Sequence, residues 1–481
     1  MKHKTVFAMV CVSAVLLTAG ALILSGQQQP TGVDIPGVIT GGEKPVIAVP
    51  DFRGSGDAQK AMDAFNRTLW NELDGSGVLK MAPKVNYPLQ VPQQPSDFKP
   101  PITTTAVVRG QQPQTVRQGP WLTDWSGPPV NANDLAFGYT AVQDGRLVLF
   151  GWLYNLSQPT TTQAQLLNKT YFGSLDENGA RDVARQFAAD ILQQFGAKSL
   201  AGSKIFFVSD RSGAKEIWTM DYDGSNQKQL TRYGSISTQP AASPDGKLFA
   251  FSTYPVQTRD GHRYEGNPQI MIHSVDTGRR LTFVNPVSSV VETPEFTPDG
   301  QHMLFSTALE NGPPQICIAN INGGNLQRIS RNRFIEVSPK VNPKNGNEIL
   351  FISGRSGHQQ LWRMNLDGSG AEMLTTGEGD VANPSWGPDG QFIAFAWTRG
   401  YEPGNFNIFI MDAAKRQPIQ LTKAMGRNEN PWWAPDGVHL VFSSKQGRST
   451  QLYTMLADGT HIQQITTQGN NLQPVWSKGI N

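Results

Sequence analysis

The second half of the chain alternates short apolar runs with polar turns. Runs such as "IFFVS" from Ile205, "ILFIS" from Ile349 and "LVFSS" from Leu440 are rich in Ile, Val and Phe, which favours β-strands. The Asp-Gly and Asn-Gly pairs between the runs predict hairpin turns, because glycine tolerates the positive φ that such turns need.

A longer motif recurs among these strands. Its fullest copies are "NPSWGPDG" at 383–390 and "NPWWAPDG" at 430–437, and the copies place prolines at 240, 294, 339, 384, 431 and 474. Each period of 43 to 54 residues holds about four short strands. Four-stranded units repeated at this spacing are typical of propeller blades, so the sequence predicts six blades.

The ends of the repeat predict how the ring closes. The first strand pair, from Lys204, has no proline motif before it, and the last motif, "QPVWS" from Gln473, has no strand pair after it. We expect the C-terminal segment to enter the first blade as its innermost strand, which leaves no open edge between the first and last blades. A β-sandwich with repetitive turns is the alternative fold.

The region before the repeats has a different pattern. A strand at 44–52 is followed by a helix with Met62, Phe65, Leu69 and Leu73 on one face and Gly75 as its stop. A short strand at 77–82, a hairpin over 134–156, a strand at 164–173 and a helix over 178–196 complete the order β-α-β-β-β-β-α. The predicted fold class is an α/β N-terminal domain followed by an all-β six-bladed β-propeller.

The N-terminus has the features of an export signal. Two lysines precede an apolar run from Val6 to Leu24, which is typical of a secretory leader, with an uncleaved membrane anchor as the alternative. We expect a leader at 1–26, a flexible arm at 27–45, the α/β domain at 46–200 and the propeller at 201–481. Cys317 would be the only cysteine left after cleavage, so no internal disulfide is expected.

The composition narrows the class of function. Without the two lysines of the leader, the chain has 39 basic and 39 acidic residues, which argues against nucleic acid as the main partner. We find no G-x-S-x-G nucleophile elbow, no calcium loop of the EF-hand type and no zinc spacing among the seven histidines. We therefore expect no catalytic residues, no metal and no cofactor.

Several segments together resemble the TolB family, the periplasmic component of the Tol-Pal system of Gram-negative bacteria. They are "PVIAVPDF" from Pro45, "GARDVARQFAADILQQF" from Gly179 and "MDYDGSNQKQLT" from Met220. The family usually has His where Arg185 stands. The resemblance implies a non-enzymatic, monomeric scaffold in the periplasm that maintains outer-membrane integrity and supports envelope constriction in cell division.

The same resemblance implies two protein partners. A Pal-like peptidoglycan-associated lipoprotein would dock on the propeller, and a TolA-like C-terminal domain would bind the N-terminal arm. The arm residues would be Val33, Asp34, Ile35, Pro36, Gly37 and Val38.

The docking site for the Pal-like partner is expected around the channel mouth, in the loops before the motif prolines. Four carboxylates there could attract a basic surface, although ordinary solvated loop charge is the alternative. The mouth residues are Val290, Val291, Glu292, Thr293, Ile335, Glu336, Ser338, Asp380, Asn383, Asn428, Glu429 and Asn430. A secreted propeller hydrolase or lyase, or a glycan-binding propeller, is the alternative function.

Overall fold

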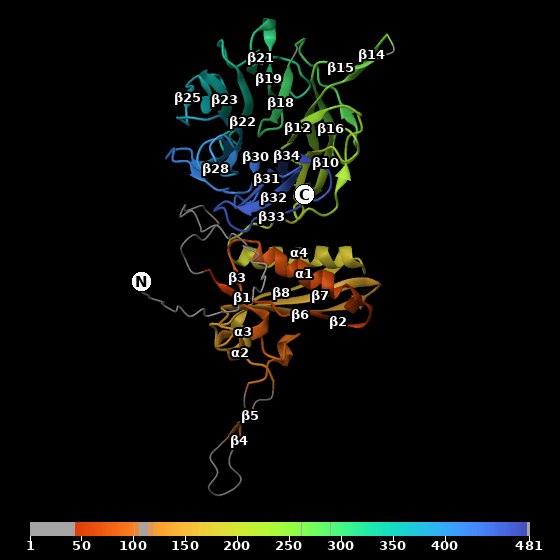
Figure 1. The fold of residues 1–481 in the computed structure, drawn as a ribbon. Helices are drawn as coiled ribbons and strands as arrows, with labels where there is room; N and C mark the ends of the chain where they lie inside the picture. Colours follow the sequence, from red (N-terminus) through yellow and green to blue (C-terminus); the bar gives the residue numbers. More distant parts are fainter. Residues whose placement is uncertain are drawn as a thin grey trace, which may run out of the picture.

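The computed structural model of the chain contains a six-bladed propeller that packs against a smaller α/β region (Figure 1). The structure describes residues 44–100, 102–104, 114–116, 119–260, 262–288 and 290–478. The predicted leader and the arm residues Val33 to Val38 lie outside these ranges. The predicted fold class is confirmed by the arrangement of the sheets.

The α/β region is built on one sheet in the order β3-β1-β6-β7-β8, with β2 beside β6. Strand β1 runs parallel to β3 and β6, and β6, β7 and β8 are antiparallel. The strands are β1 (Val46–Ala48), β2 (Arg53–Gly54), β3 (Lys80–Met81), β6 (Asp134–Gln143), β7 (Arg146–Asn155) and β8 (Gln165–Gly173). Residues Asp144 and Gly145 turn the β6–β7 hairpin with φ of 50° and 72°, as an Asp-Gly turn requires.

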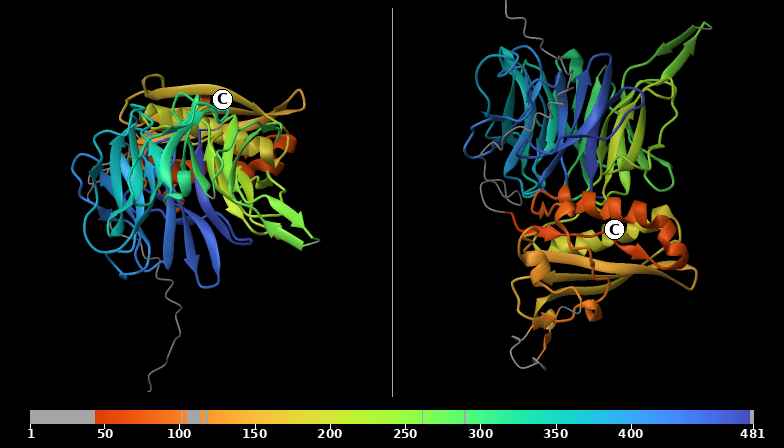
Figure 2. Two further views of the ribbon diagram at one scale, coloured as in Figure 1. Left: turned by 90° about the horizontal axis from the view of Figure 1, so that it is seen from above. Right: turned by 60° about the horizontal axis from the view of Figure 1, so that its bottom comes forward.

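Two long helices cover one face of this sheet. Helix α1 (Met62–Asp74) ends at Gly75, and α4 (Glu177–Gln194) begins at Asp176, whose side chain accepts a hydrogen bond from the Gly179 backbone N–H. Their apolar stripes pack on the sheet in one buried cluster. Both helices lie between the sheet and the propeller (Figure 2, right). No helix within the described ranges is long and apolar enough to cross a membrane.

The other face of the sheet is covered by the segment before β6. Its Trp125 is fully buried and packs with Phe98, Leu122 and the strands β6 and β7. The short elements of this segment are η2 (Lys84–Asn86), η3 (Pro95–Asp97), β4 (Ile102–Thr104), β5 (Gln114–Val116) and α2 (Thr123–Ser126). The β7–β8 connection contains α3 (Thr161–Ala164), and η1 (Gly56–Ala61) lies between β2 and α1.

Each blade is an antiparallel sheet of four strands. The innermost strands carry the motif prolines and are β12 (Ser237–Ala242), β18 (Val291–Phe296), β22 (Glu336–Val341), β26 (Val381–Trp386), β30 (Arg427–Trp433) and β34 (Asn471–Ser477). The second strands are β9 (Lys204–Ser209), β13 (Leu248–Thr253), β19 (His302–Thr307), β23 (Glu348–Ser356), β27 (Phe392–Trp397) and β31 (His439–Gln446).

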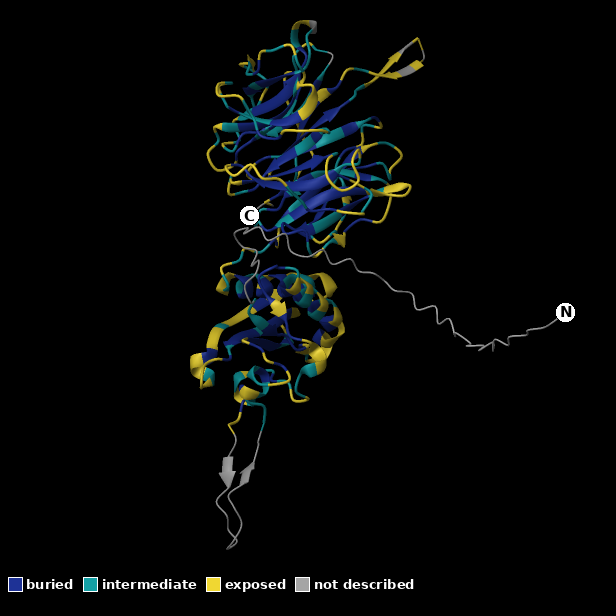
Figure 3. Cartoon of the chain, turned by 60° about the vertical axis from the view of Figure 1, so that its left-hand side comes forward, coloured by how far each residue is buried: buried dark blue, intermediate teal, exposed yellow. Residues whose placement is uncertain are grey.

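The outer half of each blade is shorter and more exposed (Figure 3). The third strands are β10 (Glu216–Asp221), β16 (Gln269–Ser274), β20 (Gln315–Asn320), β24 (His358–Asn365), β28 (Asn407–Asp412) and β32 (Ser449–Leu456). The fourth strands are β11 (Lys228–Gln229), β17 (Arg280–Leu281), β21 (Gln327–Arg328), β25 (Glu372–Met373), β29 (Ile419–Gln420) and β33 (Gln463–Gln464). Blade 2 adds a hairpin of β14 (Val256–Arg259) and β15 (His262–Glu265), and blade 3 a short helix, η4 (Leu309–Asn311).

The predicted ring closure is confirmed. Strand β34 pairs with β9 in the first blade, whose order is β11-β10-β9-β34. Val475 and Trp476 of β34 are almost fully buried, and the Trp476 Nε1–H donates to the Ser203 Oγ at 2.9 Å. The last strand of the chain thus completes the first blade.

Candidate functional site

The six motif prolines share one unusual backbone conformation. The residue before each proline has a φ of 50° to 56°, and the pairing of the innermost strand shifts register there. Positive φ is uncommon for residues other than glycine. The same bulge at six equivalent places around the ring is therefore a regular feature of this propeller and not a local irregularity. These residues are Gln239, Thr293, Ser338, Asn383, Asn430 and Gln473.

The bulges line the central channel, which holds a cavity of about 100 Å³. The Gln473 side chain accepts a hydrogen bond from the Gln239 backbone N–H at 2.8 Å, and the Gln239 side chain accepts one from Thr293 at 2.9 Å. Lys340 extends into the same channel, with its Nζ 2.7 Å from the Glu295 Oε2 and 4.4 Å from the centre of the Trp432 ring. These contacts connect blades 1, 2 and 3 with one another and blade 4 with blades 3 and 6, around a narrow channel.

The mouth of the channel lies on the face where the innermost strands begin. The mouth residues fall into three groups by exposure. The side chain of Asp380 is 51% exposed and Ile335 is 48% exposed, whereas Val291, Glu336 and Asn428 are buried. The half-buried members are Val290, Glu292, Thr293, Ser338, Asn383, Glu429 and Asn430.

The prediction of four solvated carboxylates at the mouth is wrong for Glu336. Its side chain is 0% exposed and forms an ion pair with Arg355, whose Nε lies 2.6 Å from the Glu336 Oε1. The position three residues before the motif proline is buried in every blade, because it faces the neighbouring strands; in blades 3 and 5 it is Val291 and Val381.

The three remaining carboxylates also have partners. Glu292 accepts a hydrogen bond from the Tyr254 hydroxyl, and Glu429 pairs with Arg427 at 2.6 Å. Asp380 accepts from the Gln359 backbone N–H at 3.0 Å and lies 3.5 Å from the His358 Nδ1. The mouth therefore carries less free negative charge than its sequence indicates.

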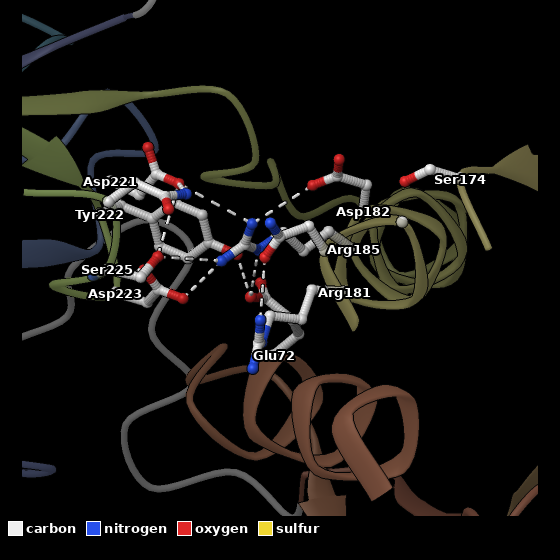
Figure 4. A network of polar contacts seen from close by, with 12 residues as sticks. Glu72, Ser174, Arg181, Asp182, Arg185, Asp221, Tyr222, Asp223 and Ser225 are labelled. Atoms are coloured by element: carbon white, nitrogen blue, oxygen red, sulfur yellow. Dashed lines mark hydrogen bonds and ion pairs between the residues drawn. The ribbon is translucent and has the colours of Figure 1, made fainter. Parts of the chain in front are cut away.

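A second polar site, which the sequence analysis missed, joins the two regions of the molecule. We call it the junction: the contact of α1 and α4 with blades 1 and 6, at the opposite end of the propeller from the mouth. Figure 4 shows its centre, where Arg185 of α4 reaches towards blade 1. Its Nη2 lies 2.5 Å from the Asp223 Oδ2, its Nη1 lies 3.9 Å from Asp221, and its side chain is 9% exposed.

Helix α1 contributes Glu72 to the junction. The Tyr222 hydroxyl of blade 1 donates a hydrogen bond to Glu72, and the Arg185 Nε lies 4.0 Å from the same carboxylate. Burial raises the pKa of Glu72 to about 7, although Tyr222 and Arg185 both act to lower it. The loop after α1 lies close to blade 6: a β-carbon added at Gly77 would be 3.1 Å from the Leu456 side chain.

Two weak features of the sequence point to the junction. On α4, Arg185 is followed at helical spacing by Ala188 and Leu192, and all three residues are buried. Arg185 is also the position at which the resemblance drawn from the sequence leads one to expect histidine. Neither feature alone identifies Asp223 or Glu72 as a partner.

The fold and these two sites define the class of the molecule: a six-bladed propeller joined through buried ion pairs to a small α/β region. The family model of the TolB beta propeller domain matches residues 196–402 and 378–479. The chain belongs to this family.

Named relatives agree with this assignment. The chain is 33% identical over 238 residues to the Protein TolB homolog of Chlorobium luteolum, an alignment that covers 49% of this chain and 50% of that protein. It is 31% identical over 170 residues to the Tol-Pal system protein TolB of Desulfosudis oleivorans, covering 35% and 36%. The chain thus spans half the length, or less, of the curated relatives it matches.

The similarity in fold extends over both regions. The crystal structure of TolB from Acinetobacter baumannii superimposes with a TM-score of 0.70 over 91% of this chain and 97% of that one, at 20% identity. The α/β region and the propeller therefore occur together in a solved structure.

Proposed function

We propose that this protein is a non-enzymatic periplasmic scaffold of a Tol-Pal system, exported by a leader at residues 1–26. Its propeller would bind a Pal-like outer-membrane lipoprotein, and its arm, Val33 to Val38, a TolA-like domain, in support of outer-membrane integrity and cell division. The observation that carries the proposal is the match of the propeller to the TolB beta propeller domain, together with the similarity of the chain to relatives named Protein TolB homolog and Tol-Pal system protein TolB.

The size of the channel favours docking over chemistry. Pockets that enclose small molecules usually measure about 300–1,000 Å³, whereas the cavity here is about 100 Å³ and is lined by prolines and side chains bonded to one another. A sugar or peptide substrate of the alternative hydrolase or lyase would not fit inside. A protein partner can instead rest on the loops around the mouth, where binding residues are commonly placed.

The exposed mouth residues are the ones to test. In the variant Ile335→Asp with Asp380→Lys, both changes fall on exposed side chains, so the fold should tolerate them. Because interface residues at the centre of a contact carry most of the binding energy, we expect at least roughly tenfold weaker binding of the Pal-like lipoprotein from the same organism, measured by surface plasmon resonance. Leu326→Asp, an exposed apolar position on the outer wall of blade 3, is the matched control and should bind like wild type.

Two further preparations complete this test. A chain lacking residues 27–43 should lose the TolA-like domain and keep the Pal-like lipoprotein. Unchanged affinity of the mouth variant would place the lipoprotein elsewhere. Recovery of sugar polymer from envelope extract, without any protein partner, would favour the glycan-binding alternative.

A further inference from the structure

His439 bridges the two regions of the molecule at the junction. It begins β31 in blade 6, where its Nδ1 lies 2.6 Å from the Asp436 Oδ2 of the same blade. Its Nε2 lies 2.8 Å from the carbonyl oxygen of Gly75, the residue that ends α1. The His439 side chain is 15% exposed and that of Asp436 is 3% exposed.

Both ring nitrogens of His439 thus face an acceptor. A neutral imidazole has one N–H donor, and only the imidazolium has two. The full set of contacts therefore requires the protonated ring. The Gly75 carbonyl also lies at the C-terminal end of α1, where the helix dipole favours a positive charge.

Glu72 is one turn away from Gly75 on the same helix, and its charge is the unbalanced one at the junction. Three other carboxylates each have a cation closer than Glu72 has: Asp221 pairs with Lys204, Asp223 with Arg185, and Asp436 with His439. Glu72 only shares Arg185, at 4.0 Å. An ionised Glu72 would therefore add an uncompensated buried charge, which is costly.

Every element packed around Glu72 supplies charged or titratable groups. Helix α4 supplies Arg185 and the segment after it Lys198, and blade 1 supplies Asp221, Tyr222 and Asp223. Blade 6 supplies Asp436 and His439. A cavity of about 210 Å³ lies among these groups, which is enough room for several waters that can carry protons.

We propose that the junction is a proton-operated latch, in which protonated Glu72 and His439 hold α1 and α4 against blades 1 and 6 and loss of these protons loosens the contact. Glu72 is accommodated as a neutral acid beside the Tyr222 hydroxyl. His439 is accommodated as a cation between Asp436 and the end of α1. Both groups favour the closed junction at mildly acid pH.

The direction of the pH dependence follows from linkage. Burial raises the pKa of Glu72 from 4.5 to about 7, so its contribution is complete below pH 4.5 and is lost as the pH rises towards 7. Burial alone would lower the pKa of His439, but the Asp436 carboxylate and the Gly75 carbonyl raise it above 6.5, so its contribution is present below pH 6.5 and is lost as the pH rises above that value.

At acid pH the stability of the junction changes with pH in the opposite direction. Burial opposes ionisation of Asp223 and Asp436, yet hydrogen bonds and the neighbouring cations hold the pKa of each below 3.8. Their contributions are present above pH 3.8 and are lost only as the pH falls below it. The junction should therefore be tightest between about pH 4 and 5 and should weaken as the pH rises from there.

Blade 3 provides a built-in control. The sequence Asp-Gly-x-His recurs there as Asp299 to His302, and the His302 Nδ1 lies 3.6 Å from the Asp299 Oδ2. The His302 side chain is 43% exposed, whereas that of His439 is 15% exposed. The two histidines share their local motif and differ in the contact with α1.

The test measures opening of the junction in the full chain by hydrogen exchange. Protection of the backbone amides of residues 69–79, corrected for the intrinsic exchange rate, is followed from pH 5 to 8.5. One linked proton changes an opening equilibrium by up to about tenfold per pH unit, so wild-type protection should fall by at least roughly tenfold across this range. His302→Gln should behave like wild type.

The variants Glu72→Gln and His439→Gln should flatten this pH dependence. Glu72→Gln keeps an acceptor for the Tyr222 hydroxyl, so it should lose less protection than the wild type between pH 5 and pH 8. His439→Gln removes the cation and should be less protected at pH 5.5. Protection of the wild type that does not change with pH, a full wild-type pH dependence in both variants, or equal behaviour of His302→Gln and His439→Gln would each overturn the proposal.

Discussion

The two ends of the propeller use charged side chains in different ways. At the mouth, Arg427 and Glu429 pair within one strand, and the Arg427 side chain is 50% exposed. At the junction, Arg185 and Asp223 pair across 38 residues and two regions of the fold, with Arg185 9% exposed. An exposed local pair adds little to stability, whereas a buried pair is costly to break. Charged residues at the mouth should therefore tolerate substitution with little loss of stability, whereas those at the junction should not.

Removing the last strand should have the largest effect, because β34 extends from the mouth of the propeller to the junction. Asn471 begins the strand at the mouth, and Trp476, near its other end, lies beside the junction. Truncation at Gln473 removes the buried Val475 and Trp476 and unpairs the edge of β9. We expect a loss of more than about 4 kcal/mol in the free energy of unfolding, measured by urea denaturation. A truncated chain with the wild-type midpoint would contradict ring closure by β34.

Replacing one arginine at each end tests the comparison directly. Arg185→Met leaves Asp223 without its cation and Glu72 with less compensation, so we expect about 3–5 kcal/mol of destabilisation. Arg427→Met removes a pair of exposed side chains and should cost less than about 1 kcal/mol. Urea denaturation of both variants at pH 7 makes the measurement. Equal costs would show that burial does not separate the two ends.

The propeller could be predicted from the sequence because its information is local and repeated. Each motif proline marks an innermost strand, each Asp-Gly a turn, and the incomplete first and last units reveal the closure. The positive φ of Thr293 and its five equivalents could not be predicted in the same way, because proline patterns normally indicate an extended residue before them.

The error at Glu336 has a specific cause. Carboxylates two, three and four residues before the motif prolines were treated as equivalent, although side chains alternate sides along a strand. Aligned by their offset from the proline, Glu336 falls on the position of Val291 and Val381, and its burial could have been inferred. The junction is different. Arg185, Glu72 and His439 come together only because the α/β region packs against the propeller, and no local sequence pattern predicts that contact.

The smallest expected effects compare two carboxylates within the mouth itself. Glu336→Gln keeps the shape of a buried side chain and removes the charge that pairs with Arg355, so we expect a loss of about 2 kcal/mol, in the range of hydrogen bonds to charged groups. Asp380→Asn changes an exposed side chain and should alter stability by less than about 0.5 kcal/mol. Thermal and urea unfolding at pH 7 separate the two values. If Glu336→Gln were as neutral as Asp380→Asn, the buried pair with Arg355 would contribute nothing to stability, and the mouth would have to be treated as one solvated surface after all.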